Sequence, residues 1–337
     1  MPGNDTPGAL MFVRRVATGI AGLALTIGAG VTPLPAQTFP EKALNLVVPF
    51  PPGGAGDIMG RIIASELQQR LGKPVIVQNR PGAGTAIAAR EVATAPPDGY
   101  TILSGSSSTF VFPHAVKSDL PYDSIKDFEP IGMIGSVALT LITHIDNPVS
   151  DVKALVAAAK ANPGKLAMAS YGAATASHFA GEMFKAAAGI DMIHVPYKGS
   201  APAMNDLIGR HIVYHVDTAV ATRPRIEEGK VRALAVFSSQ RSPFLPDVPT
   251  FAELGYSGID LTAWLALALP KGVPAEVRAK LRSSLEATLK NEAVHQKLSK
   301  LGFDLGFQAI DDWPARIARE IAGMKALAQK AGIQAED

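Results

Sequence analysis

The sequence predicts an α/β fold of two lobes, each a mainly parallel sheet flanked by helices. Short runs rich in Val, Ile and Leu alternate with Ala-rich stretches along most of the chain, which is typical of parallel α/β units. After its N-terminal segment the chain has about 300 residues, more than a single core usually supports. Two longer apolar runs interrupt the alternation, and each could connect one lobe to the other.

The N-terminal segment Met11–Ala36 has the features of a secretory signal. Arg14 and Arg15 precede an apolar run, 16–31, that is rich in Gly and Ala, as signal peptides require. A membrane anchor is the alternative, but this run is short for a bilayer span of about twenty apolar residues. We expect residues 1–36 to be a signal peptide and the mature protein to be periplasmic.

The composition excludes several classes of protein. The chain has no cysteine, which rules out a lipid-modified N-terminal Cys, disulfides, thiolate metal sites and a Cys nucleophile. Its 32 basic and 30 acidic residues leave a net charge of +2, so no strong field attracts nucleic acid. Any preference for an anion must therefore come from local geometry.

The expected elements follow one another along the chain. The strand candidates are Leu44–Val48, Val75–Gln78, Tyr100–Ser104, Lys165–Ala169, Met192–Val195, Ile212–Val216 and Arg232–Val236. The helix candidates are Asp57–Leu71, Thr85–Ala93, Asp151–Ala161, Ser177–Gly189 and Ala201–Ile208. Glycines at 72, 189 and 209 are well placed to end helices.

The two longer apolar runs, Ile131–Thr143 and Leu261–Leu269, are interpreted as crossover strands. They make one lobe discontinuous, with residues 37–140 and 264–337 forming lobe 1 and residues 141–263 forming lobe 2. Two sequential domains divided near residue 145 are the alternative, because hinge strands have no sequence signature of their own.

One pattern occurs twice: an apolar strand enters a loop of small residues, and a helix follows. In the first copy, Pro49, Pro51 and Pro52 stiffen the loop and cannot donate hydrogen bonds. The N–H groups at 53–56 then become the natural donors for a carboxylate at a helix N-terminus. Asp57 is interpreted as an N-cap or as a partner for a ligand ammonium or hydroxyl group. The glycine spacing does not match a dinucleotide fingerprint.

The second copy contains Thr175 and Ser177, and Ser177 is predicted to be an N-cap. Two such helix starts facing each other would bind a small acid from both sides. His178 is expected to support the loop, because sequence neighbours rarely form a nucleophile–base pair and the chain has no G-x-S-x-G motif,.

Other polar residues stand at predicted strand ends. Ser106 belongs to a hydroxyl-rich run after one strand, and Asp217 closes another; the carboxyl ends of strands line the crevice of an α/β sheet. His211 and His215 are four residues apart but lack the neighbouring Glu of a zinc helix. We expect no metal and no cofactor.

Several motifs together resemble the tripartite tricarboxylate transporter substrate-binding family, the Bug-type extracytoplasmic receptors. The matching segments are Val48–Asp57, Asn79–Gly84, Pro97–Thr101, Tyr171–His178, Val195–Gly199 and Leu245–Thr250. They occur in order across nearly all of the chain that follows the signal. The resemblance implies a two-lobed periplasmic-binding-protein (Venus flytrap) fold that closes on a small carboxylate, and a membrane permease as partner.

By position, the resemblance implies ligand contacts from both loops. The implied residues are Phe50, Gly53, Gly54, Ala55, Asp57, Ala173, Ala174, Thr175 and Ser177, with Ser106 and Asp217 as weaker inferences. The second loop has alanines where the family often has glycine or serine, which favours a mono- or dicarboxylate, possibly aromatic, over citrate. We expect a monomer without catalytic residues.

Two other functions stay open on the sequence alone. A secreted hydrolase or lyase acting on small acids would need a base near the loops, and only Asp57, His178 and Asp217 could serve. A receptor that senses its ligand without transporting it is the other alternative.

Overall fold

The computed structural model describes residues 39–334. The strands form one continuous path in the order β2-β1-β3-β9-β4-β7-β5-β6, and β8 and β10 both pair with β4. The strands are β1 (Leu44–Val48), β2 (Val75–Asn79), β3 (Thr101–Ser106), β4 (Phe128–His144), β5 (Ala167–Ser170), β6 (Ile193–Pro196), β7 (Tyr214–Thr218), β8 (Val231–Val236), β9 (Thr262–Pro270) and β10 (Asp304–Gln308).

Helices connect most of these strands. They are α1 (Ala55–Leu71), η1 (Ala83–Thr85), α2 (Ala86–Ala93), α3 (Ser107–Phe110), α4 (Phe112–Val116), α5 (Val152–Ala161), α6 (Ala176–Ala188), α7 (Ser200–Ile208), α8 (Ala219–Glu227), α9 (Ala275–Leu289), α10 (Glu292–Leu301) and α11 (Trp313–Ala331). None of the helices within 39–334 is both long and apolar enough to cross a membrane.

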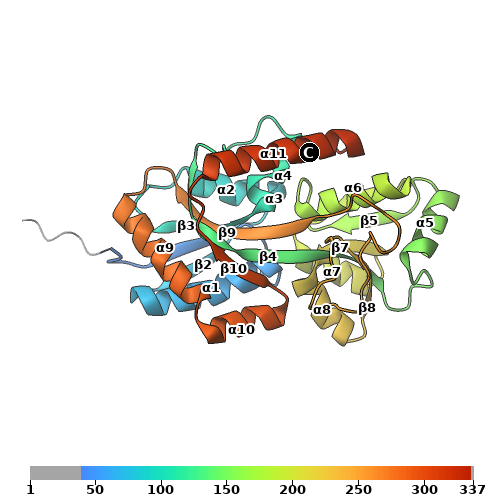
Figure 1. Ribbon diagram of the computed structural model, residues 1–337, viewed down its shortest axis with the longest axis horizontal. Coiled ribbons are helices and arrows are strands. Elements are labelled where there is room, and N and C mark those ends of the chain that lie inside the picture. Colours follow the sequence, from blue (N-terminus) through green and yellow to red (C-terminus); the bar gives the residue numbers. More distant parts are fainter. Residues whose placement is uncertain (1–38, 335–337) are drawn as a thin grey trace, which may run out of the picture. The chain divides into compact units, whose positions relative to one another are not determined.

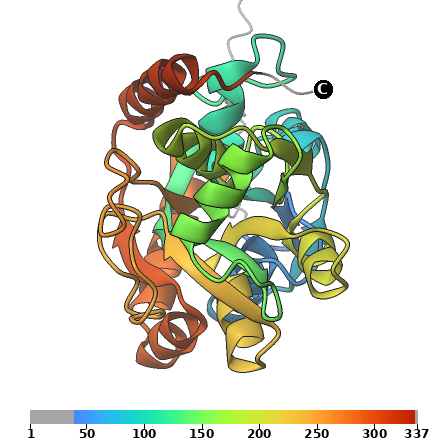
Figure 2. The ribbon, with the colours of Figure 1, turned by 90° about the vertical axis from the view of Figure 1, so that its right-hand side faces the viewer.

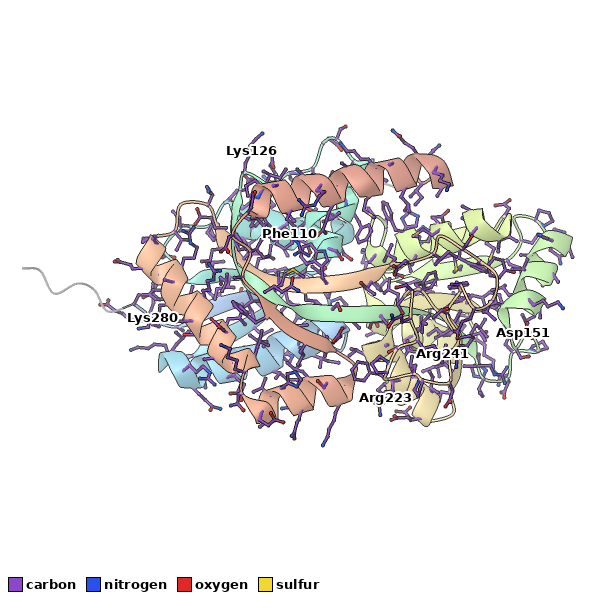
Figure 3. All side chains as sticks on the ribbon, in the orientation of Figure 1. Phe110, Lys126, Asp151, Arg223, Arg241 and Lys280 are labelled. Carbon is purple, nitrogen blue, oxygen red and sulfur yellow. The ribbon has the colours of Figure 1, made fainter. Side chains whose placement is uncertain are left out.

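The first lobe is the sheet of β1, β2, β3, β9 and β10 with the first part of β4. Strands β2, β1 and β3 are parallel, as βαβ units require, whereas β9 runs antiparallel to β3,. Phe110 is fully buried in this lobe, whereas the labelled Lys126 and Lys280 lie at its outer edge (Figure 3). Phe110 packs edge-on against Trp313 of α11, which anchors the C-terminal helix to this core,.

The second lobe is the sheet of β5, β6, β7 and β8 with the last part of β4. Strands β5, β6 and β7 are parallel. Helix α6 lies on one side of this sheet, and α7 and α8 lie on the other (Figure 1). Figure 2 views this lobe from its end, with α5 in bright green towards the viewer.

Strands β4 and β9 lie side by side (Figure 1), and β4 takes part in both sheets. They pair antiparallel from Phe128 to Ala138, after which β4 continues beside β7 and β8. The two long apolar runs are therefore strands, as predicted. The chain positions at which the lobes exchange, near 140 and 264, stay a prediction, and the expected signal peptide lies outside the described residues.

The expected strands from Leu44 to Val236 are present, with ends that shift by up to two residues in most cases. The C-terminal elements were not assigned from the sequence. Strand β10 is short, contains Gly306 and alternates between exposed and half-buried residues, so its apolar pattern was too weak to detect.

Candidate functional site

The N-terminus of α1 opens onto a cavity. Strand β1 leads into the proline-rich loop, and Gly54 is the N-cap, with extended backbone (φ −81°, ψ 166°) and no side-chain cap. The first N–H groups of a helix have no intrahelical partner. Within residues 39–334, no protein acceptor bonds the N–H groups of Gly54, Ala55 or Gly56. These donors are therefore available to a ligand.

The cavity has a volume of about 440 Å³. Its walls are apolar side chains and hydroxyl groups, with one carboxylate. The lining residues are Phe50, Gly54, Ala55, Gly56, Ser106, Ser108, Val137, Tyr171, Ser200, Asp217, Thr218, Ala263 and Leu265. No Lys, Arg or His belongs to this set, so a bound anion would be stabilised by N–H dipoles and hydroxyl groups alone.

Ser106 is the last residue of β3 and lies in the cavity wall. Its side chain is only 5% exposed, and its Oγ has no hydrogen-bond partner among the described residues. A buried polar group without a partner costs free energy of about 1–3 kcal/mol. The wall therefore offers a polar ligand an unpaired hydroxyl close to unpaired N–H groups.

Asp217 lies in β7, opposite the α1 N-terminus, and is fully buried. Its Oδ2 accepts a hydrogen bond from Ser200 Oγ at 2.6 Å and lies 3.0 Å from His215 Nε2. Its Oδ1 accepts the N–H of Thr218 at 2.7 Å. Ser200 and Thr218 also line the cavity, so this carboxylate orients two of the hydroxyl-bearing residues of its wall.

Asp57 is not the N-cap of α1, which corrects that expectation. It is not among the residues that line the cavity, and its predicted role as a ligand partner stays a prediction. It is the third residue of α1, and its Oδ2 accepts the N–H of Gly53 at 3.0 Å. Gly53 is therefore not a free donor, contrary to expectation. Burial favours a raised pKa for Asp57, but hydrogen bonds from Arg61, Asn79 and Gly53 outweigh it and hold the pKa below 3.8,. Asp57 therefore stabilises the first loop through its bond to Gly53.

The second loop is built differently from the first. The N-cap of α6 is Thr175, not Ser177 as predicted. Ser177 is fully buried, and its Oγ donates to the carbonyl of Val216 at 2.6 Å. The N–H of Ala176 donates to Ser108 Oγ at 3.0 Å. This donor at the α6 N-terminus is therefore paired with a protein side chain. Residues 173–178 do not line the cavity.

Ala174 has a positive φ of 54° and donates its N–H to His178 Nδ1 at 3.2 Å. His178 therefore supports the loop, as expected. Burial, with the neighbouring His194 and Lys185, lowers the pKa of His178 to about 3, so its ring is neutral and accepts this bond.

The structure separates the predicted ligand residues into groups. Phe50, Gly54, Ala55, Ser106 and Asp217 line the 440 Å³ cavity. Ala173 and Thr175 line a different crevice of about 350 Å³, together with Pro49, residues 82–85 and residues 197–199. Ala174 and Ser177 line neither. Phe50 and Tyr171 line both spaces, so the two adjoin. The predicted ligand contacts of the second loop stay a prediction.

Sequence reasoning missed several lining residues. Ser108 belongs to the hydroxyl-rich run that was noted, but only Ser106 was selected from it. Ser200 begins α7 directly after a third strand and loop, so the recurrence of the strand–loop–helix pattern could have identified it. Val137, Ala263 and Leu265 lie on β4 and β9 and carry no polar signal.

Four contacts join the lobes around the cavity. The Ser108–Ala176 hydrogen bond is one, and the Phe50 ring packs edge-on against Tyr171 at 6.1 Å. Gly199 lies directly against Pro51, where a Cβ would collide with the proline ring. A Cβ on Gly84, which has a φ of +59°, would lie 2.5 Å from the carbonyl oxygen of Ala173. The loops of the two lobes are therefore in direct contact.

A cavity between two α/β lobes, with β4 running from one sheet into the other, is typical of a binding protein of the two-lobed periplasmic type. Comparisons with known proteins assign the family. The model of the tripartite tricarboxylate transporter family receptor matches residues 59–333, and the chain belongs to this family. It is a solute-binding protein and not an enzyme.

Similar proteins agree along almost their whole length. Protein BugT of Bordetella pertussis is 34% identical over 94% of this chain and 97% of its own. A Rhodopseudomonas palustris protein solved with adipate superposes with a TM-score of 0.84 at 33% identity, covering 88% of this chain and 99% of that one. MatC of the same organism, solved with malate, has a TM-score of 0.79 at 29% identity, covering 86% and 99%.

Proposed function

We propose that this receptor captures a small mono- or dicarboxylate, aliphatic or aromatic, in the cavity of about 440 Å³ and delivers it to a tripartite tricarboxylate-type membrane permease. The observation that carries the proposal is the group of unpaired N–H donors at Gly54, Ala55 and Gly56 beside the unpaired Ser106 hydroxyl. Carboxylates favour helix N-termini because the backbone donors and the macrodipole both stabilise negative charge.

The wall opposite the α1 N-terminus supports a ligand with a partly apolar body. Val137, Ala263 and Leu265 offer hydrocarbon surface, and Phe50 closes one side. Adipate and malate, which are found in the two similar structures, are small dicarboxylates. Closure of the lobes on the ligand then presents one conformation to the permease, since contacts made only in the closed state shift the population towards it.

The decisive test is a thermal-shift screen of residues 37–337 against mono-, di- and tricarboxylates, aromatic acids and amino acids. The protein is first unfolded and refolded to remove any co-purified ligand. An acid at a hundred times its dissociation constant adds about 2.7 kcal/mol, which raises the unfolding midpoint by several degrees. A shift confined to acids, with the acid recovered unchanged by mass spectrometry, supports the receptor. No shift with any acid overturns it.

Delivery to a permease is tested in a strain that imports the identified acid only through a tripartite tricarboxylate-type permease. Deletion of the receptor gene should abolish uptake of the labelled acid, and the wild-type gene should restore it. Uptake that persists unchanged without the receptor would contradict the transport role while leaving acid binding intact.

A further inference from the structure

The proposed function leaves open what the cavity recognises besides a carboxylate. Ser200 and Asp217 line the cavity and belong to a chain of buried groups that continues behind the wall to His215 and the Ala169 carbonyl. His215 and Asp217 are both fully buried. His215 Nδ1 lies 3.1 Å from the Ala169 carbonyl oxygen, and Nε2 lies 3.0 Å from Asp217 Oδ2.

Asp217 is held by protein groups at both of its oxygens. Oδ2 accepts the Ser200 hydroxyl and lies against the His215 ring, and Oδ1 accepts the Thr218 N–H at 2.7 Å. The carboxylate is therefore already engaged by the protein.

The Ser200 hydroxyl uses its only hydrogen in a bond within the protein. It gives its hydrogen to Asp217 Oδ2 at 2.6 Å, and a hydroxyl has only one hydrogen but two lone pairs. Towards the cavity Ser200 can therefore only accept. A ligand group that meets it must be a donor.

Ser200 also lies close to the α1 N-terminus, where the ligand carboxylate is proposed to bind. A Cβ built on Gly54 would lie 3.7 Å from the Ser200 Cβ, so the acceptor stands beside the N-cap of α1. A ligand whose carboxylate binds the α1 N-terminus would therefore place a donor on its second or third carbon against Ser200.

The donor can be an uncharged hydroxyl or an ammonium group, and the acceptors available in the wall decide between them. Asp217 is the one acidic residue among those that line the cavity, and its oxygens are already engaged by Ser200, His215 and Thr218. An ammonium group has three hydrogens to donate, and leaving them without acceptors in a buried site is strongly unfavourable. A hydroxyl group needs only the Ser200 acceptor.

We propose that the cavity selects hydroxy acids, whose hydroxyl group lies near the carboxylate and donates to Ser200, and rejects the corresponding amino acids. This inference rests on the proposed carboxylate-binding function. It adds a second recognition point, in which Asp217 and His215 act as positioning residues for Ser200.

Calorimetry with three matched series of acids tests the inference on the ligand-free wild-type protein. The series are propionate, lactate and alanine; succinate, malate and aspartate; and 3-phenylpropionate, phenyllactate and phenylalanine. In the series that binds, we expect the hydroxy acid to bind about ten-fold more tightly than the unsubstituted acid, the effect of one hydrogen bond. The amino acid should bind at least about a hundred-fold more weakly than the hydroxy acid.

The other outcomes contradict either the hydroxyl selection alone or the proposed function as well. Equal or tighter binding of the amino acid, or of the unsubstituted acid, overturns the hydroxyl selection but leaves the carboxylate receptor standing. Binding of none of the nine acids overturns the proposed function for acids of this size, and the inference with it.

The variant Ser200→Ala sharpens the test. It should lower the affinity for the hydroxy acid about ten-fold and leave that for the unsubstituted acid unchanged, so that the two become equal. Ser107→Ala is the matched control, because Ser107 is also a buried serine but lies outside the cavity wall. A hydroxyl preference that survives in Ser200→Ala would overturn the assignment to Ser200.

Discussion

The N-termini of α1 and α6 follow the same sequence pattern, but their first N–H groups differ in their hydrogen-bond partners. Both begin after a parallel strand and a loop of small residues, and neither has a side-chain cap from its own N-cap residue. At α1 the first N–H groups face the cavity without protein partners. At α6 the Ala176 N–H bonds Ser108 from the other lobe. The fold thus uses the Ala176 N–H at α6 within the protein, whereas it leaves those of Gly54, Ala55 and Gly56 at α1 available to a ligand.

The supports behind the two loops also differ. The first loop is held by an ionised carboxylate, Asp57, together with Arg61 and Asn79. The second is held by a neutral ring, His178, and by the Ser177 hydroxyl. The charged support lies beside the site proposed to bind an anion, but its negative charge is compensated by Arg61 at 2.9 Å.

The largest effect is expected from removing one free donor. Proline is tolerated at the first position of a helix and after an extended residue such as Gly54,, so Ala55→Pro deletes one N–H with little cost to the fold. Affinity for the acid, measured by calorimetry, should fall about 10- to 100-fold, since a hydrogen bond to a charged group contributes about 1.5–3 kcal/mol. The unfolding midpoint without ligand should stay the same.

Ala176→Pro is the matched control at α6. It removes a donor that bonds Ser108 rather than the ligand, so affinity should fall less than in Ala55→Pro. Equal losses in the two variants would contradict the difference between the two helix N-termini.

The next effect concerns the support of the first loop. Asp57→Asn should lower the free energy of unfolding by about 2 kcal/mol at pH 7, because the buried carboxylate accepts charged and backbone hydrogen bonds. The folded-state pKa lies below 3.8, so the unfolded chain takes up this proton first as the pH falls. The stabilisation is full above about pH 5 and declines below it.

Denaturant unfolding of the wild type and Asp57→Asn at several pH values measures this. The difference between the two proteins should shrink as the pH falls below about 5. A difference that is constant from neutral to acidic pH would show that Asp57 does not act through its charge.

Smaller effects on stability and affinity are expected from replacing two buried serines, Ser177 and Ser106. Ser177→Ala should lower the unfolding free energy by about 1 kcal/mol, because Ser177 Oγ donates to the Val216 carbonyl,. It should not change acid affinity. Ser106→Ala should show the reverse, with a fold at least as stable and a lower affinity, because its Oγ is unpaired without ligand. Chemical denaturation and calorimetry on both variants measure this, and a stability loss in Ser106→Ala would contradict it.

The smallest effect is expected from salt. Because no Lys or Arg lines the cavity and buried interactions are screened little, affinity should change less than about two-fold between low salt and about 0.2 M. Lys198→Ala, in the neighbouring crevice, should likewise leave affinity unchanged. A steep loss of affinity with salt would instead indicate that a surface cation attracts the ligand.

Local patterns in the sequence were enough to predict most of the fold. The strands are short β-branched runs and the helices are Ala-rich, and both signals lie within a few residues. The N-terminus of α1 was also predictable, because its prolines and glycines determine the loop. The roles that depend on distant partners were not. Asp57 bonds Asn79, and the α6 N-terminus is occupied by Ser108, which lies 68 residues earlier.

The second polar wall of the cavity was only partly predictable for the same reason. Asp217 was noted as a residue at a strand end, but its buried partner is His215, two residues away on the same strand, which in turn contacts the Ala169 carbonyl of β5. Ser200 acquires its acceptor role only through Asp217. Such a chain of hydrogen bonds leaves no periodic trace in the sequence.

The contacts between the lobes have a consequence for how such receptors diverge. Gly84 meets a backbone carbonyl, Gly199 meets Pro51, and Ser108 bonds a backbone N–H. These contacts depend on small residues and main-chain atoms, and apart from Ser108 their residues lie outside the cavity wall, to which the side chains of Val137, Thr218 and Leu265 belong. Mutation can therefore change the wall, and with it the ligand, while the fit between the lobes is inherited unchanged.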